Sequence, residues 1–181
     1  ESIINEVLKL KQIKKVFIIC DDKILKKKLF KKKILFLNRG QDLKKDFLGT
    51  DYVLKQVYNK FINTHYKPTH IFVFEELYPY RPKNFFKNLI ANIDDNYDSL
   101  TPIIKNRYNN IWKKNIYGDL EIIYKTSIRT YPATEHNIFA EVKGLGTITN
   151  ADAFEMNGRE SSNTKFFEVD HKYSFKVDSL T

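Results

Sequence analysis

Short apolar runs alternate with helical patterns along the first half of the chain. Runs rich in β-branched and aromatic residues favour strands that are buried on both faces. They lie at residues 16–20, 34–37 and 71–74. Apolar residues spaced three or four apart predict helices at residues 2–12, 24–29 and 52–62. Because strands that alternate with helices favour a parallel sheet, we predict an α/β fold: a three-layer, mostly parallel sheet flanked by helices, in which the three runs are neighbouring strands.

The pattern changes after residue 97. Short runs of strand character follow one another with brief connections, at residues 99–104, 111–113, 120–124, 138–142 and 166–169. A short helix is predicted over residues 151–156, after Asn150. We therefore expect a more β-rich second half within a single domain that covers residues 1–181.

One stretch, residues 70–86, carries the order strand, loop, helix. The apolar run at 71–74 is followed by Pro79 and Pro82 on either side of Arg81, and helical spacing starts at Phe85. Ligands of open α/β sheets bind at the carboxyl ends of strands, so Arg81 is well placed to meet an anion. The same position equally suits an arginine that caps or salt-bridges the loop, and the spacing does not separate the two interpretations.

Composition narrows the function classes. The chain has 181 residues, 42% of them hydrophobic, which is enough for one sizeable core. The single cysteine, Cys20, cannot form an internal disulfide, and we expect a cytoplasmic setting. No apolar stretch approaches the roughly 18 residues of a membrane span. The net charge of +9 suits a nucleotide, a nucleic acid or an acidic sugar, although the lysine-rich run at 26–33 is more typical of a solvated helix face and loop.

The chain contains no phosphate-binding glycine loop, no zinc spacing and no hydrolytic triad. What remains is a set of charged residues after predicted strands: Asp21, Asp22, Arg39, Arg81 and Asp178. Aspartates at such a position more often cap the next helix, but with a basic cleft they also suit a magnesium-bound phosphate ligand. For Asp178 the alternative is a solvated carboxylate near the end of the chain.

Several short motifs occur in a suggestive order. They are Val16–Asp22, Arg39 with Asp46, Tyr78–Pro82, Asp98–Leu100, Arg129–Pro132 and Val177–Ser179. Their order and spacing resemble the CMP-sialic acid synthetase (acylneuraminate cytidylyltransferase) family from residue 13 to the end of the chain. In that family the matching segments are a strand ending in Ser/Thr-Asp-Asp, an Arg-Pro…Asp segment, a Ser-Pro-Leu-Arg-Pro loop, an Asp-Ser-Val strand opening, an Arg-Gln-x-Pro stretch and a metal-binding Ile-Asp-Ser/Thr segment.

The chain also departs from that family. Members begin with a strand and a Gly/Ser/Lys loop that wraps the CTP triphosphate, and nothing similar precedes Ser2. Tyr78 and Thr130 stand where Ser and Gln are usual, and the later acidic residue of the metal segment does not follow Asp178. We therefore expect a nucleotidyltransferase-like domain that is incomplete at its amino end. Calorimetry on this chain alone should show weak CTP binding or none.

The resemblance implies an enzyme that transfers CMP from CTP to an acidic sugar such as a sialic acid, in polysaccharide biosynthesis. It implies that Arg39 and Arg81 bind the nucleotide and that Asp178 is a ligand of Mg²⁺, and it leaves the catalytic residue unassigned. It also implies a homodimer, with residues 138–167 as the candidate arm. The alternative is a noncatalytic binding or assembly module with a decayed transferase fold. We do not expect a nucleic-acid partner, because the aromatic residues lie within core-like runs rather than on an exposed sheet.

Overall fold

The computed structural model describes residues 2–20, 23–28, 33–37, 43, 49–105, 110–125 and 139–177. Its helices are α1 (Ser2–Leu8), α2 (Lys23–Lys28), α3 (Thr50–Val57), the π-helix η2 (Tyr58–Ile62), α4 (Asn63–Tyr66), α5 (Phe85–Ala91), the 3₁₀ helix η3 (Lys143–Leu145), α6 (Ala151–Asn157) and the 3₁₀ helix η4 (His171–Tyr173). Its strands are β1 (Val16–Ile19), β2 (Ile34–Leu37), β3 (His70–Val73), β4 (Ser99–Lys105), β5 (Asn110–Lys114), β6 (Leu120–Lys125), β7 (Phe139–Glu141), β8 (Thr147–Asn150) and β9 (Thr164–Glu168).

The strands of the first half divide between two sheets. β1 and β2 pair in parallel, with Val16 opposite Ile34 and Ile19 opposite Leu37, as the apolar runs predict. β3 instead pairs antiparallel with β8, in a five-stranded sheet of order β3–β8–β4–β7 in which β9 pairs with β4. The prediction of one mostly parallel sheet containing β1, β2 and β3 is therefore wrong. The protein has mixed helices and strands, and its larger sheet is mostly antiparallel.

The correction comes from β8, a strand that the sequence pattern did not reveal. Its four residues stand between Gly146 and the start of α6, where the chain shows no long apolar run. β8 is antiparallel to both β3 and β4, so β3 and β4 run in the same direction with β8 between them. The chain therefore crosses from β3 through α5 to a strand of the same direction, and the inserted β8 makes both of these strand pairs antiparallel.

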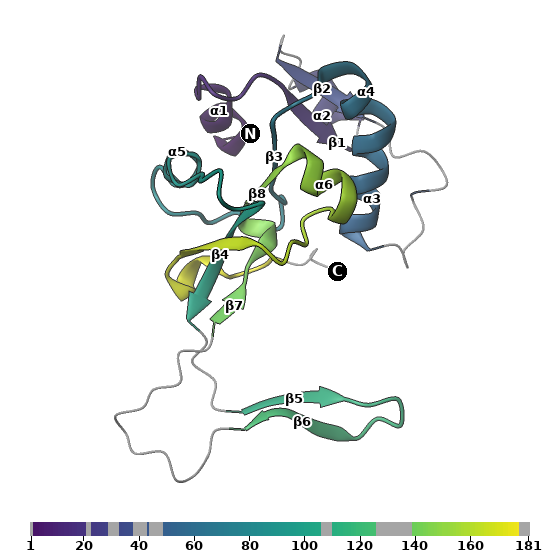
Figure 1. Ribbon diagram of the computed structural model, residues 1–181, viewed down its shortest axis with the longest axis vertical. Helices are drawn as coiled ribbons and strands as arrows, with labels where there is room; N and C mark the ends of the chain where they lie inside the picture. The colour runs from purple at the N-terminus through teal and green to yellow at the C-terminus, as the bar shows by residue number, and fades with distance from the viewer. Residues whose placement is uncertain are drawn as a thin grey trace.

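Alternate side chains of the strands pack into two different apolar clusters. Ile18 of β1 and Phe72 of β3 belong to a cluster that includes side chains of α1 and α5. Phe17, just before Ile18, and Val73, just after Phe72, belong to a second cluster with side chains of α3, η2 and α6. Because successive strand side chains point to opposite faces, helices cover both faces of these strands. Figure 1 shows α1 and α5 on one side and α3, α4 and α6 on the other.

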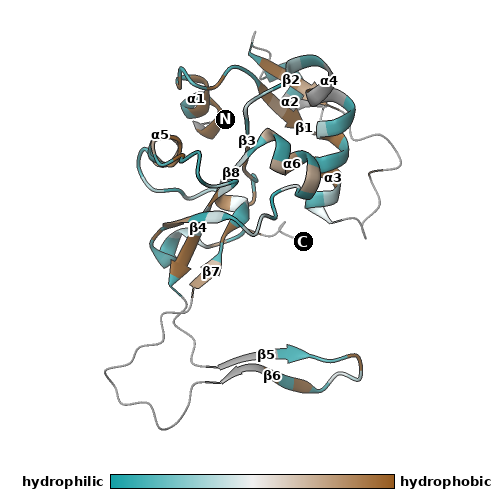
Figure 2. Ribbon diagram, in the orientation of Figure 1, coloured by the Kyte–Doolittle hydropathy of each residue, from teal (hydrophilic) through white to brown (hydrophobic). Residues whose placement is uncertain are grey.

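Two further elements complete the fold. Asn150 caps α6, because its side-chain oxygen accepts a hydrogen bond from the Ala153 N–H at 2.7 Å, which supports the predicted helix. β5 and β6 form an antiparallel hairpin that projects from the rest of the molecule (Figure 1). Hydrophobic residues are displayed at its turn (Figure 2), where Ile116 is 91% exposed. None of the helices in the described part of the chain is long and apolar enough to cross a membrane.

Candidate functional site

Arg81 lies in the loop after β3, and its guanidinium group is directed at backbone carbonyl oxygens. Nε donates to the oxygen of Leu145 at 2.9 Å, and Nη2 donates to that of Glu75 at 2.9 Å. Nη1 donates to the oxygen of Tyr78, and Nη2 also reaches that of Gly144 at 3.5 Å. One side chain therefore ties the loop at 75–82 to the turn at η3 through four backbone carbonyl oxygens.

The surroundings of Arg81 are apolar. Its guanidinium carbon lies 5.6 Å from the centre of the Phe74 ring and 5.5 Å from that of the Phe86 ring. Burial lowers the pKa of Arg81 to about 10, and the charge of Glu6 partly offsets this, so the group is charged at neutral pH. In this structure Arg81 holds the loop, which is the second of the two interpretations that the sequence allowed. Its contact with a nucleotide stays a prediction.

Glycine at position 144 lets the two segments approach closely. The Glu75 N–H donates to the Gly144 oxygen at 2.8 Å. A Cβ atom on Gly144 would lie 2.3 Å from the ring of Tyr78 and 2.9 Å from Oε2 of Glu75, distances that real Cβ contacts do not show. The side chains of Tyr78 and Glu75 thus pack directly on the backbone of η3, and only glycine fits there.

The last described residues lie against the same loop. The Val177 N–H donates to the oxygen of Leu77 at 2.8 Å. Residues 171–173 form η4, and residues 174–177 after it belong to no strand. At Val177, the residue before Asp178, the chain nevertheless contacts the loop that carries Arg81. Asp21, Asp22, Arg39 and Asp178 themselves lie outside the described residues.

A buried arginine that the sequence did not single out joins three elements at this point. Arg159 is only 4% exposed. Its Nε and Nη2 donate to Oδ1 and Oδ2 of Asp51 at 2.6 and 3.3 Å, and its Nη1 donates to Oε1 of Glu75 at 2.9 Å. Burial disfavours the charged guanidinium, but the hydrogen bonds and charges of the two carboxylates outweigh it and raise the pKa of Arg159. The first turn of α3, the loop after β3 and the segment between α6 and β9 are thereby held together.

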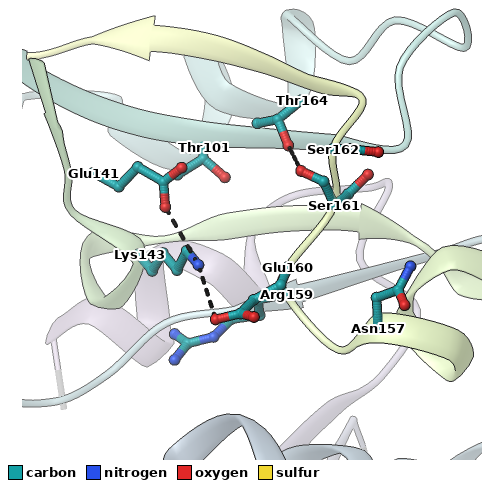
Figure 3. A pocket seen from close by; sticks show the side chains of 9 residues that line it. All are labelled: Thr101, Glu141, Lys143, Asn157, Arg159, Glu160, Ser161, Ser162 and Thr164. Atoms are coloured by element: carbon teal, nitrogen blue, oxygen red, sulfur yellow. Dashed lines mark hydrogen bonds and ion pairs between the residues drawn. The ribbon is translucent and has the colours of Figure 1, made fainter.

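An open hollow of about 450 Å³ adjoins Arg159. Figure 3 shows Lys143 between two carboxylates on one side of it: its Nζ lies 3.3 Å from Oε2 of Glu141 and 3.5 Å from Oε1 of Glu160. Hydroxyl and amide side chains complete the lining, namely Thr101, Asn157, Ser161, Ser162 and Thr164. Arg159 therefore connects the hollow, which it lines, with the loop after β3, where its partner Glu75 lies.

Sequence reasoning missed these residues for a simple reason. In the sequence, the position of Asp51 is typical of the first turn of a helix. The position of Arg159, after a short predicted helix, is typical of a charge exposed to solvent. Glu75 follows the strand that was identified, so its place at the strand end was the one available signal. Within the described ranges, no group of three or more His, Cys, Asp or Glu residues could hold a metal ion. The Mg²⁺ site therefore still rests on Asp178 and stays a prediction.

Comparison of the chain with known proteins leaves its family open, since no protein-family model and no curated protein matches it.

Proposed function

We propose that the protein is a cytidylyltransferase-type nucleotidyltransferase, which transfers CMP from CTP to an acidic sugar such as a sialic acid. The observation that carries the proposal is the hydrogen bond from the Val177 N–H to the Leu77 oxygen. It brings together the segments before Asp178 and around Arg81, which lie far apart in the sequence. The resemblance assigns both segments to one nucleotide site, so their juxtaposition supports that assignment.

The chemistry requires a hydroxyl group of the sugar to attack the α-phosphorus of CTP, with pyrophosphate as the leaving group. Negative charge on the transferring phosphoryl group must be neutralised. Mg²⁺, held by Asp178 and the substrate phosphates, would supply part of that neutralisation, since it takes few protein carboxylates and keeps phosphate oxygens as ligands. Arg39 would bind the nucleotide through its planar guanidinium. Arg81 would fix the shape of the loop through its hydrogen bonds to carbonyl oxygens.

The open hollow beside Arg159, next to the loop at 75–82, offers space for the acceptor sugar. Glu75 contributes its backbone to the loop contacts and its carboxylate to Arg159, which lines the open hollow. A polar hollow of about 450 Å³ is within the range of small-molecule sites. Nucleotide and sugar positions on either side of Glu75 would keep the reacting groups close, which is the main requirement of a transfer reaction.

Pyrophosphate release tests the proposal. The gene product that contains this chain is incubated with CTP, Mg²⁺ and a panel of acidic sugars, and we expect pyrophosphate release that requires both substrates. Asp178→Asn should lower kcat at least about tenfold, which is about 1.4 kcal/mol of transition-state stabilisation, and should raise the Mg²⁺ requirement. The unfolding midpoint should not change. Absence of pyrophosphate release from folded protein with every acidic sugar of the panel would contradict the proposal.

One observation favours the alternative of a noncatalytic module. The guanidinium group of Arg81 is already hydrogen-bonded to carbonyls of Leu145, Glu75, Tyr78 and Gly144, which leaves little of it for a phosphate. A noncatalytic module would fold and assemble normally, yet Asp178→Asn and Arg39→Ala would change neither nucleotide binding nor any turnover. Calorimetric titration of CTP into these variants of the gene product that contains this chain therefore separates the two functions.

A further inference from the structure

The parallel pairing of β1 and β2 brings lysines from separate segments to one edge of their sheet. Val16 lies opposite Ile34 in the register, and its N–H donates to the oxygen of Lys33 at 2.9 Å. Lys15 and Lys33 each stand directly before one of these two strands, and both are exposed. Because neighbouring strands lie about 4.8 Å apart, the two lysines start from adjacent points of the backbone.

The connection between the two strands adds a second group of lysines. A parallel connection must carry the chain from the end of β1 back to the start of β2, so α2, which lies between them, ends toward the same edge. Its last turn consists of Lys26, Lys27 and Lys28, which are all exposed. Lys28 is five positions before Lys33, so their Cα atoms are at most about 18 Å apart.

The end of α4 borders this edge from another side. The ring centre of Tyr66, the last residue of α4, lies 5.8 Å from Nζ of Lys15 and 5.2 Å from the ring centre of Phe17. Lys67, which follows, is exposed. Figure 1 shows α4 beside β1 and β2 in the upper part of the view. We call this surface the basic edge, and its members are Lys14, Lys15, Lys26, Lys27, Lys28, Lys33 and Lys67.

The positive charges of the basic edge are not balanced by acidic residues. The segments 7–20, 23–37 and 63–70, from which it is built, contain aspartate only after residue 20, outside these ranges, and contain no glutamate. Within the described part of the chain, no carboxylate forms an ion pair with any of its seven lysines. Because like charges repel one another, a partner with spread-out negative charge is attracted to this edge.

The chemistry of the basic edge suits a diffuse anionic surface better than a nucleic acid. Arginine, which binds phosphates and base edges with two parallel hydrogen bonds, is absent from the three segments. The ring of Tyr66 already contacts Lys15 and Phe17, so it offers no free platform for a stacked base. Both α2 and α4 end here, and the last turn of a helix presents carbonyl oxygens rather than the N–H groups that bind a phosphate.

We propose that the basic edge is a docking surface for the headgroup layer of an anionic lipid bilayer, to which it binds by charge. Clusters of four to eight lysines or arginines are typical of such surfaces, because each charge close to an anionic leaflet adds to the attraction. The basic edge lies at the amino ends of β1 and β2, whereas the ligands of parallel strands bind at the carboxyl ends. Docking therefore leaves the carboxyl ends accessible, and the inference does not rest on the proposed function.

Co-sedimentation with lipid vesicles tests the inference. The gene product that contains this chain is mixed with vesicles of phosphatidylcholine, with or without phosphatidylserine. We expect binding that requires phosphatidylserine and that is lost when the salt concentration is raised from about 50 to about 500 mM, because salt screens exposed charges. The variant Lys14→Gln/Lys15→Gln/Lys33→Gln should bind at least about tenfold more weakly, and Lys26→Gln/Lys27→Gln/Lys28→Gln should show a similar loss.

The matched control changes three exposed lysines outside the basic edge. Lys83→Gln/Lys87→Gln/Lys113→Gln has the same net charge as each of the other two variants, and its vesicle binding should stay within about twofold of the wild-type value. All the substituted lysines are exposed, so the variants are expected to fold, and their unfolding midpoints verify this. The two variants of the basic edge lie on different elements, so a folding defect in one leaves the other as a test.

Four results would overturn the inference. They are no binding to phosphatidylserine vesicles at low salt, equal binding to vesicles of phosphatidylcholine alone, an equal loss of binding in the control variant, and displacement of the protein from the vesicles by a mixed-sequence DNA duplex at an equal concentration of charge. The last result would make a nucleic acid the partner of the basic edge. Pyrophosphate release is measured without vesicles, so failure of the transferase and failure of membrane docking are separate outcomes.

Discussion

Arg159 and Asp51, which are 108 positions apart, form a two-bond ion pair with Nε–Oδ1 and Nη2–Oδ2 distances of 2.6 and 3.3 Å. The same guanidinium reaches Glu75 at 2.9 Å. A buried arginine with two carboxylate partners holds α3 against the end of β3 and the segment after α6. The geometry of the loop that carries Arg81 therefore depends on charges far from it in the sequence.

Replacing Arg159 with Met should lower the free energy of unfolding by about 2–3 kcal/mol. The reason is that Asp51 and Glu75 lose their cation, and breaking a fully buried pair costs roughly 3–5 kcal/mol. The smaller figure reflects the partial exposure of the carboxylates, 35% and 23%. Urea unfolding measures the change. Lys172→Met, which removes an exposed ion pair with Asp170, is the control and should cost less than about 0.5 kcal/mol. Equal effects of the two substitutions would show that the pairing of Arg159 does not stabilise the fold.

Gly144→Ala should cost about 1–3 kcal/mol, because the new methyl group overlaps the ring of Tyr78 and forces the two segments apart. Tyr78→Ala removes the ring and makes room. The double variant should therefore be more stable than the sum of the two single changes indicates, and urea unfolding of all four proteins gives the coupling energy. Strict additivity would mean that the ring of Tyr78 does not limit the approach of η3.

Arg81→Ala should lower the free energy of unfolding by roughly 2–4 kcal/mol, since part-buried carbonyl oxygens lose their donor. Arg81→Lys should recover little of this, because one ammonium group cannot span the carbonyls that the planar guanidinium reaches. Chemical denaturation of both variants measures the stability, and CTP titration of the same variants in the gene product that contains this chain measures the nucleotide affinity. A lysine variant with wild-type stability and weakened CTP binding would assign Arg81 to the nucleotide instead.

The resemblance implies a homodimer with residues 138–167 as the candidate arm, and the exposed β5–β6 hairpin is a second candidate for the contact. Residues 139–168 contain β7, β8 and β9 of the five-stranded sheet, whereas the β5–β6 hairpin projects with Ile116 91% and Tyr117 83% exposed. We expect a dimer at tens of micromolar in sedimentation, and dissociation when Ile116 and Tyr117 are both changed to Asp, because burying a charge at an apolar contact is costly. A monomeric wild-type protein would refute the dimer. A dimer that persists in the double variant would place the contact elsewhere.

Several features were accessible from the sequence because they are local. The apolar runs predict β1, β2 and β3 because a strand buried on both faces needs apolar side chains at successive positions. Asn150 before a helical pattern predicts the start of α6, because an N-cap bonds to an N–H three residues away. The prolines around Arg81 likewise predict a loop between β3 and α5. Arg39 and Asp178, the other two predicted site residues, lie outside the described residues and stay predictions.

Tertiary structure decided which strands pair and which charges meet. β8 has four residues and no distinctive pattern, yet its insertion between β3 and β4 makes the larger sheet mostly antiparallel. Strand pairing depends on contacts between distant residues, and the local periodicity is the same for a parallel and an antiparallel neighbour. The same holds for Arg159, whose sequence neighbourhood contains neither Asp51 nor Glu75. A side chain's charge is visible in the sequence, but its partner and its burial arise only when the chain folds.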